Sequence, residues 1–412
     1  MSGTLDPLAE VRRSLIVEFA ALPGEGDVVA WQRRLADAII DAEAGSPQHD
    51  SAELKWHRHL LRVIGDALVH ALLPAHTIRA LSRHPGRPPS LSAQGEDFDF
   101  VFECARTLRR SGAVPIVADL TTLVGIGDLV GWGGGGVGVY ECKNRTPPMR
   151  MSTSGRVARQ RLRGERTEEY LTGSRIEEEG GPVREAYDFP LPEPEWEAVR
   201  DLLERCLAAP TKLATHSFGT DDTLIACSRD TVLDDVADQL PTGEHLAMPA
   251  MAVYSELIES ADHRLWAPSS YPLSGDLRWR LLENELSVIR FVDMGALEAE
   301  FTEGAVRGWL TPRRGEHGFE VGLDVAGFEP ITFTHQLVGF CLWMPVPVSA
   351  MRATLIDHAR VLVAQVEPGQ GLGSAMNLAE GDTFVYSTAY RAGEAGLVPG
   401  PRPLTGPAVP DP

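Results

Sequence analysis

The stretch from 127 to 144, GDLVGWGGGGVGVYECKN, contains two acids and a lysine whose spacing suits metal-dependent hydrolysis. Asp128 stands near its start, and Glu141 and Lys143 stand two positions apart near its end. On a strand, Glu141 and Lys143 share a face and Cys142 points to the opposite, apolar side. Carboxylates bind Mg²⁺ or Mn²⁺, which polarises a phosphate and activates water, and a lysine can orient that water. The pattern predicts phosphodiester hydrolysis if the chain folds Asp128 back against Glu141.

The glycines in the middle of this stretch offer a second interpretation. Residues Gly133 to Gly138 match G-x-G-x-x-G, the spacing of a dinucleotide-binding loop. Such a loop needs a helix directly after it, because the N–H groups at the helix start hold the pyrophosphate. Here VGVYECK follows, which alternates like a strand, and then Pro147-Pro148. We therefore expect the glycines to form a hairpin connection between antiparallel strands, and no dinucleotide cofactor.

The segments around the stretch must form the elements that position its acids. Apolar periodicity predicts a helix, then three short strands, then a second helix, over 95–112, 113–122, 126–132, 137–143 and 155–171. An Asp and a Glu-x-Lys on neighbouring strands can also be plain ion pairs on a solvated face. The apolar and glycine-rich flanks, the order of the elements and the basic residues that follow favour the metal site.

Basic residues gather directly after the stretch. From Lys143 to Arg166 there are eight basic residues and one acid, Glu165, so this window carries +7 while the whole chain carries −20. On a helix, Arg156, Arg159, Arg163 and Arg166 form one stripe, with Gln160 close by. The stripe either contacts phosphates beside the metal site or is a solvated face paired with the acidic body.

Because of these residues, the block 95–171 resembles the PD-(D/E)xK, or restriction-endonuclease-like, nuclease superfamily. The matching segments are Gly127-Asp128-Leu129-Val130 and Val139-Tyr140-Glu141-Cys142-Lys143-Asn144. The resemblance implies a restriction-endonuclease-like αβββα core of α/β class. It also implies that Asp128, Glu141 and the main-chain carbonyl of Cys142 bind Mg²⁺ (or Mn²⁺), with Lys143 catalytic. Gly127 stands where the family name has Pro.

The resemblance also suggests further site residues and a biological role. An acid on the first helix, Asp99 or Glu103, is expected near the metal, although a solvated helix face explains both equally well. The residues expected to contact nucleic acid, with DNA the favoured substrate, are Arg145, Arg156, Arg159, Gln160, Arg163 and Arg166. A role in restriction or anti-phage defence follows, with a homodimer as one candidate assembly. The alternative is a non-catalytic nucleic-acid-binding or scaffold protein built on the same fold.

Composition limits the other classes. The chain is 43% hydrophobic and 23% charged, as in ordinary soluble proteins. Its five cysteines include no C-x-x-C pair, which argues against a disulfide framework or a thiolate zinc site and favours the cytoplasm. The start of the chain lacks the apolar run of a signal peptide, and the most apolar stretch, 331–348, contains His335 and two prolines. We therefore expect no membrane partner.

The rest of the chain is expected to form flanking regions, giving an α+β protein overall. A helical N-terminal region is predicted over 1–90, with Asp27 and Ser51 as N-caps. The nuclease core is predicted over 91–180, with an extension to 230 left open. An α+β C-terminal domain is predicted over 231–366, and the Gly/Pro-rich residues 367–412 are predicted to be a disordered tail.

Overall fold

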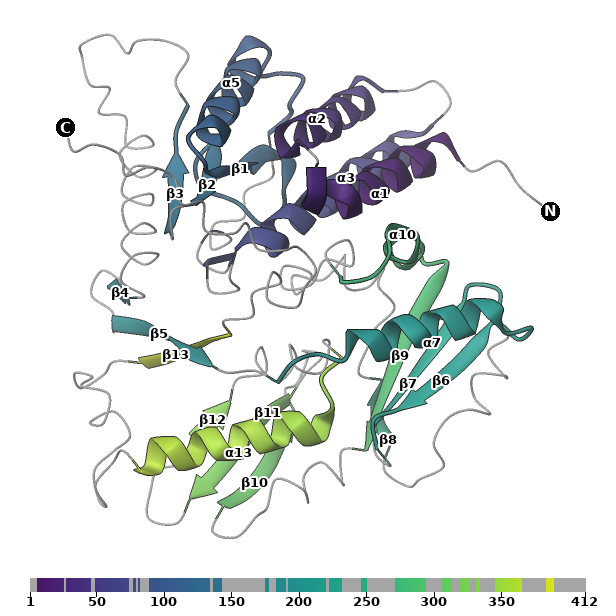
Figure 1. The fold of residues 1–412 in the computed structure, drawn as a ribbon, viewed down its shortest axis with the longest axis vertical. Coiled ribbons are helices and arrows are strands. Elements are labelled where there is room, and N and C mark those ends of the chain that lie inside the picture. Colours follow the sequence, from purple (N-terminus) through teal and green to yellow (C-terminus); the bar gives the residue numbers. More distant parts are fainter. Residues whose placement is uncertain are drawn as a thin grey trace. The chain divides into compact units, whose positions relative to one another are not determined.

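The computed structural model describes residues 6–25, 27–45, 49–73, 77–78, 81, 89–133, 136–142, 175–177, 183–189, 192–219, 222–231, 246–249, 271–293, 306–312, 319–325, 331–333, 345–364 and 383–388. These residues mix helices with small sheets, so the α+β class is confirmed (Figure 1). The chain divides into two compact units. The first contains 1–176, 264–279 and 390–412, and the second contains 177–263 and 280–389.

The first unit begins with three helices inside the predicted helical region, α1 (Pro7–Glu25), α2 (Val28–Ala44) and α3 (Ser51–Leu72). Asp27 caps α2 as expected, because its carboxylate accepts hydrogen bonds from the N–H groups of the first turn. The prediction of Ser51 as the cap of α3 is wrong by one residue. Asp50 is the cap, since its carboxylate accepts from the Glu53 N–H while the Glu53 side chain accepts from the Asp50 N–H.

A helix and three strands follow in the predicted order. They are α5 (Glu96–Arg110), β1 (Val114–Val117), the short 3-10 helix η1 (Ala118–Leu120), β2 (Leu129–Gly133) and β3 (Gly136–Tyr140). The strands form one antiparallel sheet in the order β1-β2-β3. Gly133 pairs with Gly136, so the glycine run is a hairpin connection and a strand follows it. The helix that a dinucleotide loop requires is therefore absent after these glycines.

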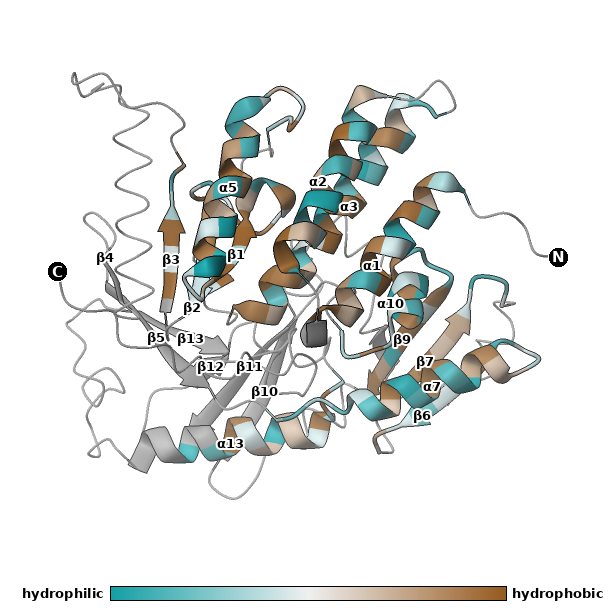
Figure 2. Cartoon of the chain, turned by 45° about the horizontal axis from the view of Figure 1, so that its top comes forward, coloured by the Kyte–Doolittle hydropathy of each residue, from teal (hydrophilic) through white to brown (hydrophobic). Residues whose placement is uncertain are grey.

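The sheet is too small to be stable without the helices that cover it, because three short strands bury little apolar surface alone. Apolar residues run along the strands and along the facing sides of α2, α3 and α5 (Figure 2). Two fully buried strand residues, Ile116 and Val130, contribute to this core. The apolar face predicted for α5 is confirmed by the buried Phe98, Val101, Phe102 and Ala105.

Gln32 of α2 completes the outer edge of the sheet. Its side-chain amide accepts a hydrogen bond from the Val117 N–H at 2.8 Å and donates to the Pro115 carbonyl at 2.9 Å. These two backbone groups point away from β2, so the buried amide occupies the place that a neighbouring strand would take. The sheet edge is thus satisfied by a helix side chain, which fixes α2 against β1.

The second unit contains a four-stranded sheet in the order β6-β7-β9-β8, built from Leu213–Ser217, Asp222–Ser228, Leu286–Asp293 and Leu246–Pro249. The helix α7 (Trp196–Ala208) packs on β6 and β7. A buried ion pair joins Arg290 to Asp222, which also accepts from the Val348 N–H at the start of α13 (Val348–Ala364). The strands β8 and β9 and the helix α13 lie inside 231–366, where an α+β domain is predicted.

Two further sheets complete the second unit. One has the order β10-β11-β12, from Val306–Pro312, Phe319–Val325 and Ile331–Phe333. The other has the order β13-β5-β4, from Thr383–Thr388, Val183–Phe189 and Arg175–Glu177. The first two residues of β4 belong to the first unit. The strand β13 lies inside 367–412, where a disordered tail is predicted. Its sequence, TFVYST, is rich in β-branched and aromatic residues that suit a strand.

The helix α10 (Gly275–Leu282) begins in the first unit, where Arg13 of α1 pairs with Asp276.

The Gln32 contacts generate a stability prediction. Gln32→Leu keeps the apolar volume but leaves the Val117 N–H and the Pro115 carbonyl without their amide partner. Each buried polar group left unsatisfied costs about 1–3 kcal/mol, so the free energy of unfolding should fall by about 2–6 kcal/mol. Urea unfolding followed by circular dichroism measures this change.

Arg34→Ala is the matched control on the same helix. Arg34 forms an exposed ion pair with Glu18, which is worth about 0–1 kcal/mol. If Gln32→Leu proved no more destabilising than Arg34→Ala, the assignment of the sheet edge to Gln32 would be wrong.

Candidate functional site

The β2–β3 pairing brings Asp128 back to the Glu141-Cys142 segment. Leu129, directly after Asp128, pairs with Tyr140, directly before Glu141. The Asp128 N–H donates to the Tyr140 carbonyl at 2.9 Å. The Cys142 N–H donates to Oδ2 of Asp128 at 2.6 Å. The condition set by the sequence, that the hairpin returns Asp128 to this segment, is therefore confirmed.

Asp128 is also bonded to the strand on its other side. Its main-chain carbonyl accepts a hydrogen bond from the Ala118 N–H at 3.0 Å, where β1 ends. Asp128 thus lies in the middle of the sheet, with backbone bonds to both neighbouring segments. Its side chain is half-buried, whereas Glu141 is exposed at the end of the ladder.

Gly127 provides the backbone turn directly before Asp128. Its φ is +72°, a left-handed conformation that glycine adopts without strain. A Cβ at this position would lie 2.6 Å from Cγ1 of Val139 and 3.1 Å from the Tyr140 carbonyl oxygen. Proline cannot replace it, because its ring fixes φ near −65°. The departure from the Pro of the family name therefore has a structural cause at Gly127.

The thiol of Cys142 is hydrogen-bonded to Cys104 of α5. Burial raises the pKa of this thiol to about 12, and a hydrogen bond with Cys104 of α5 and the charges of Cys104, Asp128 and Glu141 act in the same direction. The thiol therefore stays protonated at neutral pH and is no nucleophile. The contact with Cys104 agrees with the prediction that Cys142 points inward.

The two additional acids proposed on the first helix have other surroundings. Asp99 forms an ion pair with Arg33 of α2 at 2.5 Å, and this hydrogen bond is the main reason that the pKa of Arg33 is raised. Glu103 is exposed on α5. Asp99 is thus connected to α2, and the main-chain carbonyl of Glu103 accepts a hydrogen bond from the Thr107 hydroxyl within α5.

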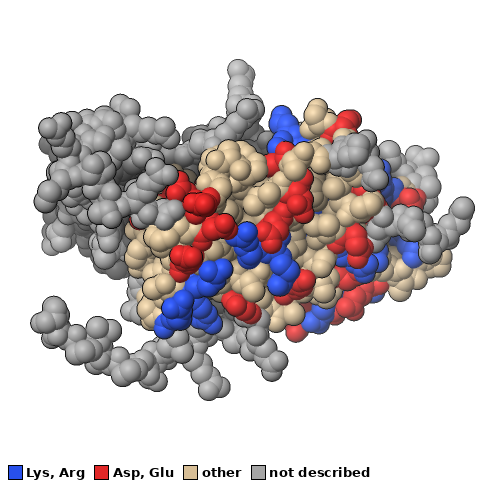
Figure 3. Space-filling model, turned by 90° about the horizontal axis from the view of Figure 1, so that it is seen from above, with Lys and Arg blue, Asp and Glu red and all other residues tan. Residues whose placement is uncertain are grey.

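Several of the predicted site residues lie outside the described part of the chain. They are Lys143, which is predicted to be catalytic, and the residues predicted to contact nucleic acid, Arg145, Arg156, Arg159, Gln160, Arg163 and Arg166. On the described surface seen in Figure 3, basic and acidic side chains are interspersed. Within the described residues, no group of three or more His, Cys, Asp or Glu is arranged to hold a metal ion.

Asp119 is a neighbouring acid that the sequence interpretation passed over, because it falls inside the segment predicted as the first strand. It lies on η1, directly after the residue that donates to Asp128. Its carboxylate accepts a hydrogen bond from Nε2 of Gln94 at 2.8 Å. Burial raises the pKa of Asp119, and the Gln94 hydrogen bond opposes that shift. An acid where a predicted strand ends beside the motif is the signal that could have identified it.

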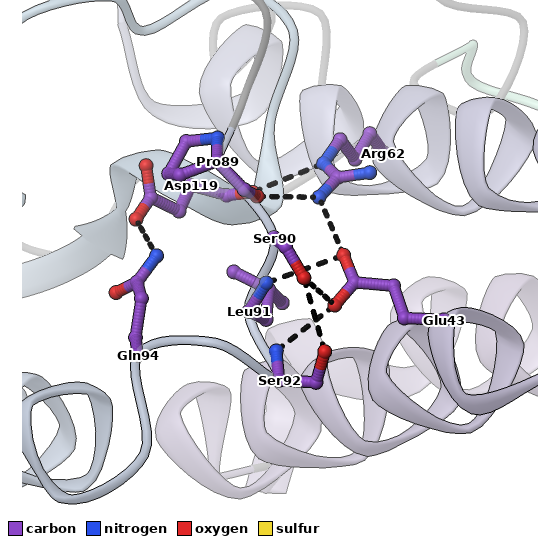
Figure 4. Close-up of polar contacts among 8 residues, drawn as sticks. All are labelled: Glu43, Arg62, Pro89, Ser90, Leu91, Ser92, Gln94 and Asp119. Carbon is purple, nitrogen blue, oxygen red and sulfur yellow. Dashed lines mark hydrogen bonds and ion pairs between the residues drawn. The ribbon is translucent and has the colours of Figure 1, made fainter.

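A partly buried polar cluster holds η1 and the chain before α5 against the helices (Figure 4). Arg62 of α3 donates to the main-chain carbonyls of Asp119 and Pro89 and lies 3.6 Å from the Glu43 carboxylate. Burial would raise the pKa of Glu43, but hydrogen bonds from Ser92, Ser90 and Leu91 lower it overall. Glu43 is therefore held ionised opposite Arg62.

Asp66 of α3 holds the loop that leads into Asp128. Its carboxylate accepts hydrogen bonds from the N–H groups of Thr122 and Leu123, at 2.7 and 3.2 Å, and from the Thr122 hydroxyl at 2.5 Å. Full burial raises the pKa of Asp66 to about 7, although these hydrogen bonds oppose the shift. The same helix residue thus fixes the loop and titrates near neutral pH.

Comparisons with known proteins add no constraint to this site. No protein-family model matches the chain, and no curated protein or solved structure matches it. Among the described residues, no helix combines the length and the apolar character needed to cross a bilayer.

Asp66 makes stability depend on pH in a defined direction. Its pKa is about 3.8 in the unfolded chain and about 7 in the folded one. Between these values the unfolded chain releases a proton that the folded chain keeps, so stability falls as pH rises from 4 to 7. Asp66→Asn remains neutral, and its amide can accept from the two N–H groups and donate to the Thr122 hydroxyl.

The comparison of Asp66→Asn with wild type isolates this effect. We expect the free energy of unfolding of the variant, minus that of wild type, to rise by on the order of a few kcal/mol between pH 4 and 7 and then to level off. Denaturant unfolding at a series of pH values measures it. A difference that stays constant with pH would show that Asp66 is ionised throughout.

Proposed function

We propose that this protein is a metal-dependent nuclease of the PD-(D/E)xK type that hydrolyses phosphodiester bonds in DNA. The observation that carries the proposal is the 2.6 Å hydrogen bond from the Cys142 N–H to the Asp128 carboxylate. It joins the acid of the first motif segment to the Glu-x-Lys segment of the second, although 13 positions separate Asp128 from Glu141. The order α5-β1-β2-β3 supports a restriction-endonuclease-like core, whose last helix is predicted over 155–171.

The chemistry of the donor set fits Mg²⁺ or Mn²⁺. The carboxylates of Asp128 and Glu141 and the main-chain carbonyl of Cys142 are hard oxygen donors, which these cations prefer. The protonated Cys142 thiol turns toward Cys104, so no soft thiolate competes for the cation. The hydrogen bond from the Cys142 N–H to Oδ2 orients the Asp128 carboxylate, as partners of metal-binding carboxylates commonly do. A bound divalent cation supplies charge that polarises the phosphate and lowers the pKa of a water.

The remaining steps belong to residues of the chain. Lys143, two positions after Glu141, orients or deprotonates the attacking water and offsets charge that develops on the phosphate. The basic window that starts at Lys143 attracts the nucleic-acid backbone to an otherwise acidic protein. We place the nuclease in the cytoplasm and propose restriction or anti-phage defence as its biological role.

Cleavage of supercoiled plasmid DNA tests the proposal. Wild type should nick the plasmid when Mg²⁺ or Mn²⁺ is titrated in and should be inert in EDTA. Asp128→Asn, Glu141→Gln and Lys143→Ala should each lower the rate by on the order of 100-fold or more, the scale of losing one electrostatic catalytic group. Gel electrophoresis measures the rate, and circular dichroism establishes that each variant is folded.

Glu10→Gln serves as the matched control, because Glu10 is an exposed acid on α1 and lies outside the motif. Its rate should equal that of wild type. If wild type bound DNA but cleaved no substrate with any divalent metal, the alternative of a non-catalytic binding or scaffold protein would replace the nuclease.

A further inference from the structure

Two thiols are in contact on the α5 side of the small sheet. Cys104 lies on α5, and Cys142 directly follows Glu141. The two thiols are hydrogen-bonded to each other. Both residues are partly exposed, and both cysteines are free. The first unit thus holds an accessible dithiol that joins a helix to the segment of the motif.

The packing of α5 on the sheet supports this contact independently. A Cβ at Gly131 would lie 3.7 Å from Cδ1 of Leu108 and 3.0 Å from Cε2 of Tyr140, so helix and strand side chains meet over this glycine. Cys104 precedes Leu108 by about one turn of α5, which is about 6 Å along the helix axis. Cys142 follows Tyr140 by two residues, which is about 7 Å along an extended chain. The matched spacing brings the two cysteines together.

Cys142 connects this thiol pair to the proposed cation site through its main chain. Its N–H donates to Oδ2 of Asp128 at 2.6 Å, and its carbonyl is one of the proposed ligands. Side chains of successive residues on an extended chain point to opposite faces, so the thiol and Glu141 lie on different sides. A chemical change at the sulfur therefore reaches the cation site by moving the Cys142 backbone.

A disulfide would cause such a movement. Its sulfur atoms are bonded at about 2.05 Å, much closer than two hydrogen-bonded thiols can approach. Closing the bond pulls Cys142 toward α5. The N–H that orients the Asp128 carboxylate and the carbonyl that is proposed to bind the cation both move with it.

We propose that Cys104 and Cys142 form a redox-modification site, at which hydrogen peroxide converts the dithiol into a disulfide that weakens cation binding. The disulfide itself is inferred from the thiol contact, whereas its effect on the cation rests on the proposed function. Disulfides of cytosolic proteins are usually transient and are often redox-sensing. A small oxidant suits two thiols that are only partly exposed.

One molecule of peroxide balances the reaction. Cys104 attacks first, because the acids next to Cys142 disfavour a thiolate there. Its sulfur bonds to one peroxide oxygen, the O–O bond breaks, and the departing hydroxide takes the thiol proton as water. The Cys142 sulfur then attacks the sulfenic sulfur of Cys104, the S–O bond breaks, and this hydroxide leaves with the Cys142 proton as water. Both sulfurs are oxidised and both peroxide oxygens are reduced, and the fixed contact favours the second attack.

Mass spectrometry of the full-length protein tests the modification. Reduced wild type is treated with hydrogen peroxide, the remaining thiols are alkylated, and the protein is digested without reductant. We expect a peptide pair linked through Cys104 and Cys142, which dithiothreitol separates again. Free thiols at both positions, sulfinic acids without a link, or a disulfide from either residue to a different cysteine would overturn the proposal. This measurement needs neither a variant nor nuclease activity.

Mn²⁺ affinity tests the effect on the cation, with the electron paramagnetic resonance signal of free Mn²⁺ as the readout. Oxidation of wild type should weaken Mn²⁺ binding by about 10- to 100-fold, the range for losing an outer partner of a metal ligand, and dithiothreitol should restore it. Cys104→Ser should bind Mn²⁺ like reduced wild type and should not respond to peroxide. Cys227→Ser is the matched control, because Cys227 is a partly exposed cysteine on β7, and it should respond like wild type.

The outcomes separate this inference from the nuclease proposal. A disulfide between Cys104 and Cys142 that leaves Mn²⁺ affinity unchanged would overturn the effect on the cation. A loss of affinity that persists in Cys104→Ser would overturn it too, because the oxidised group would then lie elsewhere. If the disulfide formed but reduced wild type bound no Mn²⁺, the cation site and its regulation would both be refuted, and the redox modification would stand.

Discussion

The site depends on one constraint: Asp128, directly before β2, is hydrogen-bonded to the neighbouring segments on both sides of it. Its carbonyl accepts from Ala118, its N–H donates to Tyr140, and its carboxylate accepts from Cys142. Three segments that are distant in the sequence therefore meet at one residue. If the β2–β3 register slipped by one position, side chains would move to the opposite face of the sheet, and Glu141 would lose its place beside Asp128.

The rest of the first unit keeps this small sheet in place. Three short strands would not hold their register alone, so the helices contribute buried polar side chains as well as apolar cover. Gln32 satisfies the outer edge of β1, Asp66 holds the loop before Asp128, and Arg62 with Glu43 holds η1. Each of these groups bonds backbone that would otherwise be buried without a partner. The helical region and the sheet therefore act as one unit, although the sequence suggested separate regions.

Much of this local structure could be predicted from the sequence, because its signals are local. Alternation in VGVYECK and the glycine run were enough to predict a hairpin, and the apolar stripe of α5 was enough to predict a helix. Side-chain contacts between distant segments carry no such signal. Nothing in the spacing of Gln32 or Asp66 indicates that they bind strand and loop backbone. Asp99 shows that a local pattern can also mislead. Its position on the first helix suited a metal ligand, but its partner in the structure is Arg33 of α2.

The glycines also needed the structure before their roles could be told apart. The sequence indicated a turn for Gly133 to Gly138 only. Gly127 acts through its positive φ, and Gly131 and Gly138 leave room for the Tyr140 ring that lies over them. The central claim is that these constraints create a cation site from Asp128, Glu141 and the Cys142 carbonyl. Crystals grown with Mn²⁺ test it most directly by anomalous scattering. We predict one peak about 2.0–2.6 Å from an oxygen of each ligand. Asp128 and Glu141 carboxylates more than about 8 Å apart, with no peak between them, would contradict the account, because they could not share one cation.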